Sequence, residues 1–354
     1  MSAQNNSGVQ PPNTSAAPAP SRFRSGMMGR LLTPGLVVIL VAIIAAMIYG
    51  ATGGAARREA WYTVLLFVGL ASSLNILLGY TGYVSFGHIV FFGFGGYIGF
   101  FAIYQLGWNL LPASLLGGAA AALLALGLGL AILRLRGAYF ALATIGINEA
   151  MKALVINIPA LGGPNGMVLN FGIYASYGGA AQAQWTVYWA TAVLTLMVVL
   201  TSYIVKKSKF GLGLMAIRED EDAAEVMGVV APRAKTWAYV ISALFPGILG
   251  VLFFFKASNI EPAAAFNLNR SIELLVMVML GGQGTVLGPI LGAGGYQLLR
   301  TTLLTSDLAL FGLKIKDIQL AVAGLLLLII VLFIPVGFIG WLRSRSTRLR
   351  RWLE

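Results

Sequence analysis

Few residues in this chain have side chains that carry out catalysis or bind metal ions. The sequence contains no cysteine and one histidine, His88. A thiolate nucleophile, a disulfide and a histidine-based metal cluster are therefore excluded. No Gly-x-x-x-x-Gly-Lys-Ser/Thr sequence is present, so the chain does not cradle ATP phosphates in that way. We expect no catalytic residue, metal ion or cofactor. An integral membrane enzyme is disfavoured because no nucleophile and base can be recognised.

A group of polar side chains falls in and around the glycine-interrupted stretch 75–88. Unwound backbone at membrane depth is tolerated only inside protein or beside a watery cavity. The stretch therefore predicts a lining for a translocation pathway, although its glycines also suit close helix packing. No acidic residue lies near His88 in the sequence, which argues against a proton relay. The predicted pathway residues are Asn75, Thr81, Ser85, His88, Glu149 and Gln283.

Glu149 lies well inside an apolar segment, 138–157. An unpaired carboxylate is unfavourable there. Lys152, three residues further on, shares the same helix face and can neutralise it. We expect this pair to face the interior of a helix bundle. A pair that acts in transport and a pair that is purely structural are both compatible with the pattern.

The segments that must position these residues are long and apolar. Hydrophobic residues make up 58% of the chain and charged residues only 10%, with a mean hydropathy of +0.84. A water-soluble domain needs more polar surface than this. A span needs about 20 residues to cross the hydrocarbon core, so the sequence predicts an all-α polytopic membrane bundle of about ten spans, with about eight as the lower bound. The predicted spans are 31–49, 61–79, 85–106, 112–133, 138–157, 185–205, 236–256, 271–283, 286–304 and 318–339. The eighth is too short to cross alone and precedes a glycine-rich break.

The charge distribution predicts the topology. The net charge of +12 would also suit nucleic-acid binding, but the basic residues lie between apolar runs and at the termini, so no nucleic-acid partner is expected. With a cytoplasmic N-terminus most basic residues fall on the inner side, which places both termini in the cytoplasm. Residues 1–30 form a polar, disordered tail, 31–340 the transmembrane domain and 341–354 a basic cytoplasmic tail. The first apolar run is longer than the core of a signal peptide and is read as a retained span.

The longest inner loop, 206–235, carries a helical pattern over 214–227 with five acidic residues beside small and apolar ones. Such a helix can dock into a groove of a soluble partner. A solvated surface helix whose acids balance nearby lysines and arginines is the alternative. A further pattern is internal: the glycines at 79–82 and 95–96 are echoed at 281–284 and 294–295. Related halves with glycine-interrupted helices occur in transporters.

The loop and three other stretches resemble a known family. Residues 221–228, Glu-Asp-Ala-Ala-Glu-Val-Met-Gly, are similar to the E-x-A-A-x-x-x-G signature of ABC importer permeases. Residues 75–88, 135–144 and 279–289 resemble branched-chain amino acid ABC transporter permeases of the M type. The resemblance covers about 60–340. Residues 161–166 depart from the T-G-G-S-D-G that the family usually shows, which puts the preferred substrate in doubt. The polar tail at 1–21 also has no expected counterpart.

The resemblance implies a bacterial inner-membrane, multi-pass permease subunit that conducts branched-chain or other neutral amino acids. Its implied partners are the lipid bilayer, a second homologous permease, two ATP-binding subunits that carry out hydrolysis and an external substrate-binding protein. The implied ATPase-coupling residues, on a loop helix over 212–228, are Arg218, Glu221, Ala224, Glu225 and Gly228. The implied docking residues for the binding protein are Gly163, Pro164, Asn165 and Gly166.

Two other transport functions compete with this interpretation. A urea or short-amide ABC permease resembles the amino acid type closely, and nothing in the spans decides between them. A stand-alone secondary carrier or channel needs its own coupling site, normally ionisable groups at mid-membrane. The chain offers few such groups.

Overall fold

The computed structural model describes residues 34–305, 309–310, 313–314 and 339. Seven helical segments in this part are long and apolar enough to cross a membrane, and the shorter apolar helix α2 joins them. The predicted all-α polytopic membrane fold is therefore confirmed. The predicted tails 1–30 and 341–354, and nearly all of the predicted last span 318–339, lie outside the described residues.

The elements run in the following order. The long helices are α2 (Pro34–Ala51), α3 (Ala55–Thr81), α4 (Ile89–Leu106), α5 (Leu110–Ile132), α6 (Ala138–Ile156), α7 (Ala180–Lys207), α10 (Ala231–Ala257), α12 (Leu268–Gly281) and α13 (Leu287–Thr305). The shorter elements are η1 (Pro159–Leu161), η2 (Gly163–Asn165), β1 (Met167–Val168), η3 (Phe171–Tyr177), α8 (Lys209–Glu219), α9 (Glu221–Val226), β2 (Asn259–Ile260), α11 (Pro262–Ala265), β3 (Ala309–Leu310) and β4 (Leu313–Lys314). β1 pairs antiparallel with β2, and β3 pairs antiparallel with β4.

Helix α3 is the central element of the bundle. Every residue from Leu65 to Thr81 is buried, because α7, α10, α12 and α13 pack around it. Its sequence carries apolar or small residues on all sides rather than on one stripe, which is the pattern of a helix enclosed by protein. It ends at Gly82, whose φ of 76° is the left-handed geometry of a helix C-cap.

Small residues bring α4, α5 and α10 into close contact. A Cβ atom at Gly95 of α4 would lie 2.5 Å from the Gly247 Cα in α10 and 2.7 Å from the Gly117 carbonyl oxygen in α5. Between helices in lipid, such close approach replaces the hydrophobic effect as the source of stability. The glycines therefore fix how these three helices cross.

Helices α12 and α13 form a hairpin around Gly282, where φ is 115°. The expectation that the eighth segment is too short to cross is corrected here. The apolar stretch starts earlier, at Pro262, so that α11 and α12 together reach the length of a span. The glycine echo seen in the sequence corresponds to two helix–turn–helix units, because α3 and α12 each end at a glycine with positive φ and α4 and α13 follow.

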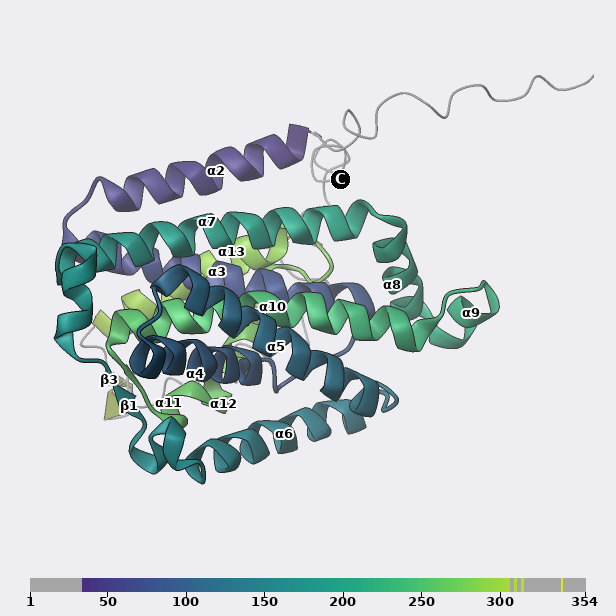
Figure 1. Ribbon diagram of the computed structural model, residues 1–354. Coiled ribbons are helices and arrows are strands. Elements are labelled where there is room, and N and C mark those ends of the chain that lie inside the picture. Colours follow the sequence, from purple (N-terminus) through teal and green to yellow (C-terminus); the bar gives the residue numbers. More distant parts are fainter. Residues whose placement is uncertain (1–33, 306–308, 311–312, 315–338, 340–354) are drawn as a thin grey trace, which may run out of the picture.

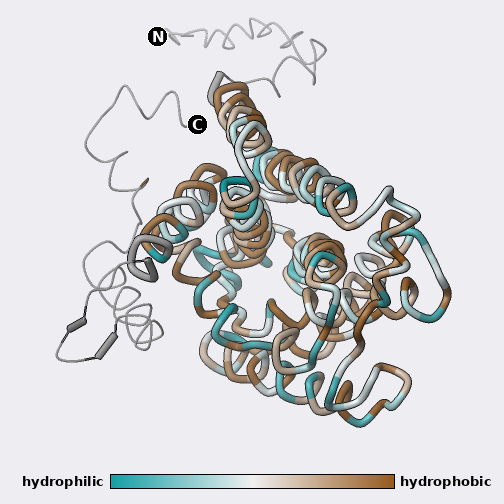
Figure 2. Tube along the Cα trace, turned by 90° about the vertical axis from the view of Figure 1, so that its left-hand side faces the viewer, coloured by the Kyte–Doolittle hydropathy of each residue, from teal (hydrophilic) through white to brown (hydrophobic). Residues whose placement is uncertain are grey.

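The bundle has two distinct ends (Figure 1). Helices α8 and α9 project at the right of the view, and β1 and the η helices lie at the left. Helix α2 runs along the outside, over α3 and α7. Helix α6 lies at the opposite edge and has few buried residues. Figure 2 looks at the end that carries β1 and shows apolar residues along the helices. These are the α8–α9 end and the β1 end of the bundle.

Candidate functional site

The loop at the α8–α9 end contains two helices rather than one. The single helix expected over 214–227 is wrong, because the chain leaves helical geometry at Asp220, which is extended with φ −158° and ψ 115°. The Asp220 side chain accepts a hydrogen bond from the Ala223 N–H at 3.0 Å. This N-cap starts a new helix in a new direction. Asp220 thus lets α9 turn away from α8.

Arg218, near the end of α8, reaches into the bundle. Its Nη1 donates to the Gly79 carbonyl of α3 at 2.9 Å. Asn75 ties the same part of α3 to the α12–α13 turn: its Nδ2 donates to the Thr285 carbonyl and its Oδ1 accepts from the Gly284 N–H, both at 3.0 Å. A Cβ at Gly284 would lie 2.6 Å from Arg218 Nη1. We call Asn75, Gly79, Arg218, Gly284 and Thr285 the glycine junction.

The first residue of α9 is held by a second set of contacts. Glu221 accepts from Lys235 Nζ at 2.7 Å and from the Tyr83 hydroxyl at 2.8 Å. Lys235, only 2% exposed, also donates to the Tyr83 hydroxyl at 2.9 Å. Arg136 lies 3.6 Å from Glu221 and pairs with Asp222 at 2.9 Å. These five residues, the Glu221 network, join α9 to α10, to the α3–α4 turn and to the α5–α6 turn.

The Glu221 network shifts the proton affinities of its acidic groups. Burial alone would raise the pKa of Glu221, but the hydrogen bonds from Lys235 and Tyr83 and the charges of Lys235 and Arg136 outweigh it and lower that pKa. The hydrogen bond and charge of Arg136 lower the pKa of Asp222. Burial and the hydrogen bond to Glu221 raise the pKa of Tyr83. At neutral pH the network therefore holds two carboxylates and a protonated phenol.

The predicted coupling residues divide between two faces of the loop. Arg218 and Glu221 make the contacts above, and Ala224 is 3% exposed in a cluster with residues of α3 and α8. Glu225 and Gly228 face solvent. Three of the five thus contact the chain itself and two lie on its surface.

The exposed side of α8 and α9 is apolar with acidic residues around it. Leu212 is 60% exposed, Val226 88% and Met227 84%. Glu219 and Glu225 are exposed beside them. Exposed apolar residues with charges nearby, such as Val226 and Met227 beside Glu225, are what helix-in-groove docking requires.

The predicted pathway residues of the stretch 75–88 are enclosed by the chain itself. Asn75, Thr81, Ser85 and His88 are each at most 2% exposed. Asn75 belongs to the glycine junction, and Thr81 Oγ1 donates to the carbonyl four residues earlier. His88 Nε2 lies 3.2 Å from the Ser73 hydroxyl, and its Nδ1 has no hydrogen-bond partner among the described residues. The pathway role of these residues stays a prediction.

Two other predicted pathway residues are more accessible. Gln283 lies half-buried in the α12–α13 turn, beside the glycine junction. Glu149 pairs with Lys152 at 3.9 Å, with side-chain exposures of 59% and 34%. The expectation that this pair faces the interior of this chain's bundle is wrong, because α6 turns Asn148 inward to the Phe266 carbonyl and leaves Glu149 on its outer face.

The predicted docking turn lies at the β1 end. Gly163 is buried, and Pro164 and Asn165 are exposed at the surface in η2. Gly162, Gly163 and Gly166 have φ values of 84°, 58° and 73°. Residues that carry a Cβ atom rarely adopt positive φ, whereas glycine does so readily. The turn also packs closely on β2, because a Cβ at Gly166 would meet the Ile260 carbonyl oxygen, and its docking role stays a prediction.

Comparison with known proteins now places the chain in a family. Residues 57–331 match the family model described as branched-chain amino acid transport system / permease component. The chain belongs to this family. It is therefore a multi-pass membrane protein of the branched-chain amino acid permease family.

Individual relatives of the chain are likewise named as permeases. The chain is 32% identical over 257 residues to the high-affinity branched-chain amino acid transport system permease protein LivM of Escherichia coli, covering 65% of this chain and 59% of that protein. It is 26% identical over 221 residues to a probable LivM of Methanocaldococcus jannaschii, covering 58% and 61%. The fructose import permease protein FrcC of Rhizobium meliloti matches at 27% over 30% of each chain. The chain spans about three fifths of the length of the first relatives. No solved structure matches.

Several charged residues of this permease-family chain become prominent only in the structure. Lys235 and Arg136 join the Glu221 network, although the sequence indicated only a role in topology for them. Lys256, Arg270 and Arg300 meet in a cavity at the β1 end. In the predicted topology these three fall on the outer side, among the minority of basic residues, and that was the available signal in the sequence.

Proposed function

We propose that this chain is a permease subunit of an ATP-driven importer and forms part of the pathway for branched-chain or other neutral amino acids. ATP hydrolysis takes place on a separate subunit that docks on α8 and α9. The family match and the printed names of the relatives support the transport class. The amino acid substrate is taken from those names.

One observation carries the coupling role. The surface offered to a partner, Val226 and Met227, sits on a helix whose first residue is fixed to α10 through Glu221 and Lys235. The adjoining α8 is fixed to buried α3 through Arg218. A displacement of α8 and α9 is therefore transmitted to two separate spans, α3 and α10, rather than absorbed in a loose loop.

The direction of the motion follows from the connectivity. Helix α7 runs into α8, and α9 runs into α10, so closure of the ATPase pair would re-tilt α7 and α10. Helix α3 would follow through the glycine junction. A change of tilt of this kind closes the translocation pathway on one side of the membrane and opens it on the other. The Glu221 network and the glycine junction connect the surface helices α8 and α9 to the spans. A stand-alone carrier has no partner to bind at such surface helices, so the site gives that function no support.

The outer face of α6 supports a second permease subunit. A Glu149–Lys152 pair on an apolar span is unfavourable against lipid. The described part of the chain covers the pair only in part, since the Glu149 and Lys152 side chains are 59% and 34% exposed. A protein partner or a watery pathway between two permeases accommodates it. We place the second, homologous permease against this face.

The proposed topology puts the α8–α9 end in the cytoplasm, with both termini on that side of the inner membrane. Basic residues concentrate at this end, including Arg136, Arg218 and Lys235, and the positive-inside bias supports the assignment. The β1 end then faces outward. There Pro164 and Asn165 are presented to an external substrate-binding protein.

The test is uptake by a reconstituted complex. The chain is assembled in proteoliposomes with a second permease and the two ATP-binding subunits, and a candidate binding protein with labelled leucine or labelled urea is supplied outside. We expect leucine uptake that requires ATP and the ATP-binding subunits. Uptake that persists without them would contradict the importer function, and uptake of urea alone would contradict the substrate class.

Docking of the ATP-binding subunits is tested by introducing charged residues on the exposed surface of α9. Val226→Asp with Met227→Asp should abolish co-purification of the ATP-binding subunits, because two buried charges in an apolar contact are strongly unfavourable. Phe171→Asp, at a residue that is 73% exposed near the β1 end, is the control and should leave co-purification intact. Equal co-purification for the two variants would place the docking surface elsewhere.

A further inference from the structure

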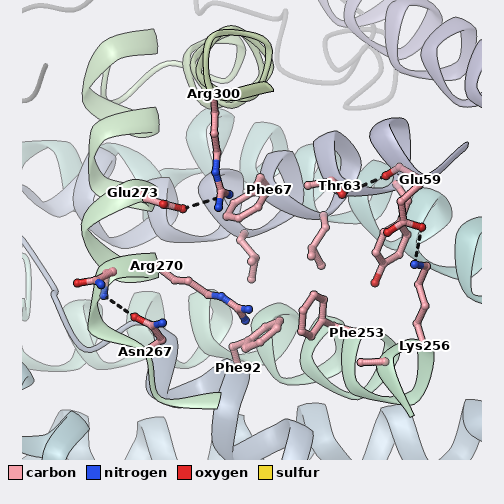
Figure 3. Close-up of a pocket in the computed structure, with 15 residues that line it drawn as sticks. Glu59, Thr63, Phe67, Phe92, Phe253, Lys256, Asn267, Arg270, Glu273 and Arg300 are labelled. Carbon is pink, nitrogen blue, oxygen red and sulfur yellow. Dashed lines mark hydrogen bonds and ion pairs between the residues drawn. The ribbon is translucent and has the colours of Figure 1, made fainter. Parts of the chain in front are cut away.

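A cavity of about 660 Å³ opens at the β1 end and is lined mainly by α3, α10, α12 and α13. Figure 3 shows Arg270 and Arg300 reaching into it from α12 and α13. None of its lining residues belongs to the glycine junction or the Glu221 network. The cavity is therefore separate from the site to which the coupling role is assigned.

The cavity extends from the surface to about the middle of the span α3. Its lining on this helix runs from Glu59, whose side chain is 57% exposed, to Leu70, which is 3% exposed. At 1.5 Å per residue these two positions are about 16 Å apart, roughly half the thickness of the hydrocarbon core. The mouth of the cavity is thus at the β1 end, and its floor is deep in the membrane.

Arg270 belongs to the deep part of the cavity. The next residue, Ser271, accepts a hydrogen bond from the Ile89 N–H. The residue before Ile89, His88, contacts Ser73 of α3, which lies one turn beyond the floor of the cavity. An arginine at this depth is unfavourable against lipid, and ionisable residues in such positions usually mark a functional site.

The charged residues that line the cavity carry one positive charge in excess, with three cations against two acids. Lys256 is paired with Glu59 at 2.6 Å near the mouth, and Arg300 lies 3.7 Å from Glu273. Arg270 has no ion pair within 4.0 Å and no side-chain hydrogen bond in the part of the chain that the structure describes. The unmatched charge is therefore at the deep end.

Hydrogen-bond donors are also unused there. The Arg270 guanidinium lies 4.8 Å from the centre of the Phe253 ring and 5.9 Å from that of Phe92. The aromatic rings stabilise the cation but do not satisfy its N–H groups. Arg300 Nε is buried and has no hydrogen-bond partner among the described residues. Buried donors without acceptors are unfavourable, so the site calls for an acceptor from a ligand.

The remaining wall is mixed. It combines four uncharged polar residues with five apolar ones: Tyr62, Thr63, Asn267 and Asn269, and Leu66, Phe67, Leu70, Phe92 and Phe253. Sites for small organic molecules have such walls, with a few polar groups among apolar ones, and volumes of about 300 to about 1,000 Å³. The space is larger than a single inorganic ion requires.

Charge and depth select among the anions. A phospholipid headgroup stays at the bilayer surface, whereas Arg270 lies near the middle of the span. A zwitterion brings no net charge and leaves the excess in place. A free phosphate group carries roughly 1.5 to 2 negative charges at neutral pH and would reverse the excess. A monocarboxylate cancels one charge, and its two oxygens match the planar fork of a guanidinium.

We propose that this cavity binds a water-soluble organic monocarboxylate that has no ammonium group. The carboxylate pairs with Arg270 at the deep end, beside Arg300, and the apolar body packs on Phe67 and Leu70. In the proposed topology the ligand enters from the outer side. This ligand class differs from the amino acids of the proposed function, and its binding requires neither ATP nor a partner subunit.

The experiment measures binding to the full chain in nanodiscs of phosphatidylcholine, with labelled 4-methylpentanoate as the probe. The unlabelled competitors are 4-methylpentanoate, its amide, acetate and leucine. The amide lacks the charge, acetate lacks most of the apolar body, and leucine adds an ammonium group to a cavity that already has a positive excess. Each of the three should compete at least about tenfold more weakly than 4-methylpentanoate.

Variants test the contact with Arg270. Arg270→Gln should weaken binding of the probe by about tenfold or more. Arg270→Lys should fall between this variant and the parent, since it keeps the charge without the fork. Arg57→Gln removes an exposed cation of α3 that does not line the cavity and should bind as the parent does. The competitor series on the unmodified chain provides the test if Arg270→Gln fails to fold.

Several outcomes would overturn the assignment. One is equal competition by 4-methylpentanoate and its amide or leucine, and another is parental binding by a folded Arg270→Gln chain. Loss of probe binding in nanodiscs of phosphatidylglycerol would show that a lipid headgroup occupies the site, and would overturn a water-soluble ligand. Leucine uptake by the reconstituted complex is scored separately. Its absence beside Arg270-dependent binding of the probe would contradict the transport function and leave the cavity assignment supported.

Discussion

The Arg218 guanidinium and the Gly79 carbonyl oxygen are 2.9 Å apart, although the two residues are 139 positions apart in the chain. Arg218 belongs to a surface helix and Gly79 to the most buried helix of the bundle. The contact depends on glycines at 79 and 284, because a side chain at either would meet the junction. The junction therefore joins α8 directly to the centre of the bundle.

Gly284→Ala should disrupt the glycine junction. The residue has a φ of 76°, and its added Cβ would lie 2.6 Å from Arg218 Nη1. An alanine held in left-handed geometry costs about 1 kcal/mol or more, and the displaced arginine adds to this. We expect a lower unfolding temperature in detergent and slower uptake. Gly294→Ala, a helical glycine with nothing within 4 Å of its Cβ, should unfold at or above the parent's temperature. Equal behaviour of the two variants would remove the junction from the coupling route.

Glu221→Gln should loosen the attachment of α9. Lys235 would remain buried without its carboxylate, and loss of one partner of a buried pair costs about 3–5 kcal/mol. Hydrogen exchange of α9 amides should therefore accelerate, and ATP hydrolysis should become partly uncoupled from uptake. Asp222→Asn is the control because its carboxylate is exposed. If Asp222→Asn accelerates exchange as much as Glu221→Gln does, burial of Lys235 is not what holds the helix.

Acid should weaken the Glu221 network. The folded chain lowers the pKa of Glu221 and of Asp222, so the two carboxylates contribute stability above their ordinary pKa of about 4. That contribution is lost as the pH falls through the lowered values of the folded state. Thermal unfolding between neutral and acidic pH should show a steeper loss for the parent than for Glu221→Gln. Parallel pH profiles would contradict the assignment.

The Glu149–Lys152 pair should tolerate exchange better than loss. Glu149→Gln leaves Lys152 unpaired on a face that we assign to the second permease, and reduced assembly and uptake are expected. Glu149→Lys with Lys152→Glu restores an ion pair at the same i, i+3 positions and should recover much of the function. Co-purification of the two permeases measures the effect. Normal uptake by Glu149→Gln would make the pair merely structural.

Much of the fold follows from local sequence. Long apolar runs place α3, α4, α5, α6, α7 and α10 close to their predicted bounds, because a span needs about 20 apolar residues whatever packs around it. The break at Asp220 was missed because a residue that caps a helix also occurs on a helix surface. The outward direction of Glu149 was missed for a different reason. A pair at helical spacing fixes a shared face but not what that face meets.

The sequence by itself determined that this is an α-helical protein of the lipid bilayer. It also determined the family resemblance and the acidic loop that carries part of it. These features depend on composition and on residues that are neighbours in the chain. Only the tertiary structure decided that Arg218 meets Gly79, that Glu221 is held by Lys235 and Tyr83, and that Lys256, Arg270 and Arg300 line one cavity. Each of these contacts joins residues from different helices. Their distances depend on how glycine contacts set the helix crossings, and no local pattern records that geometry.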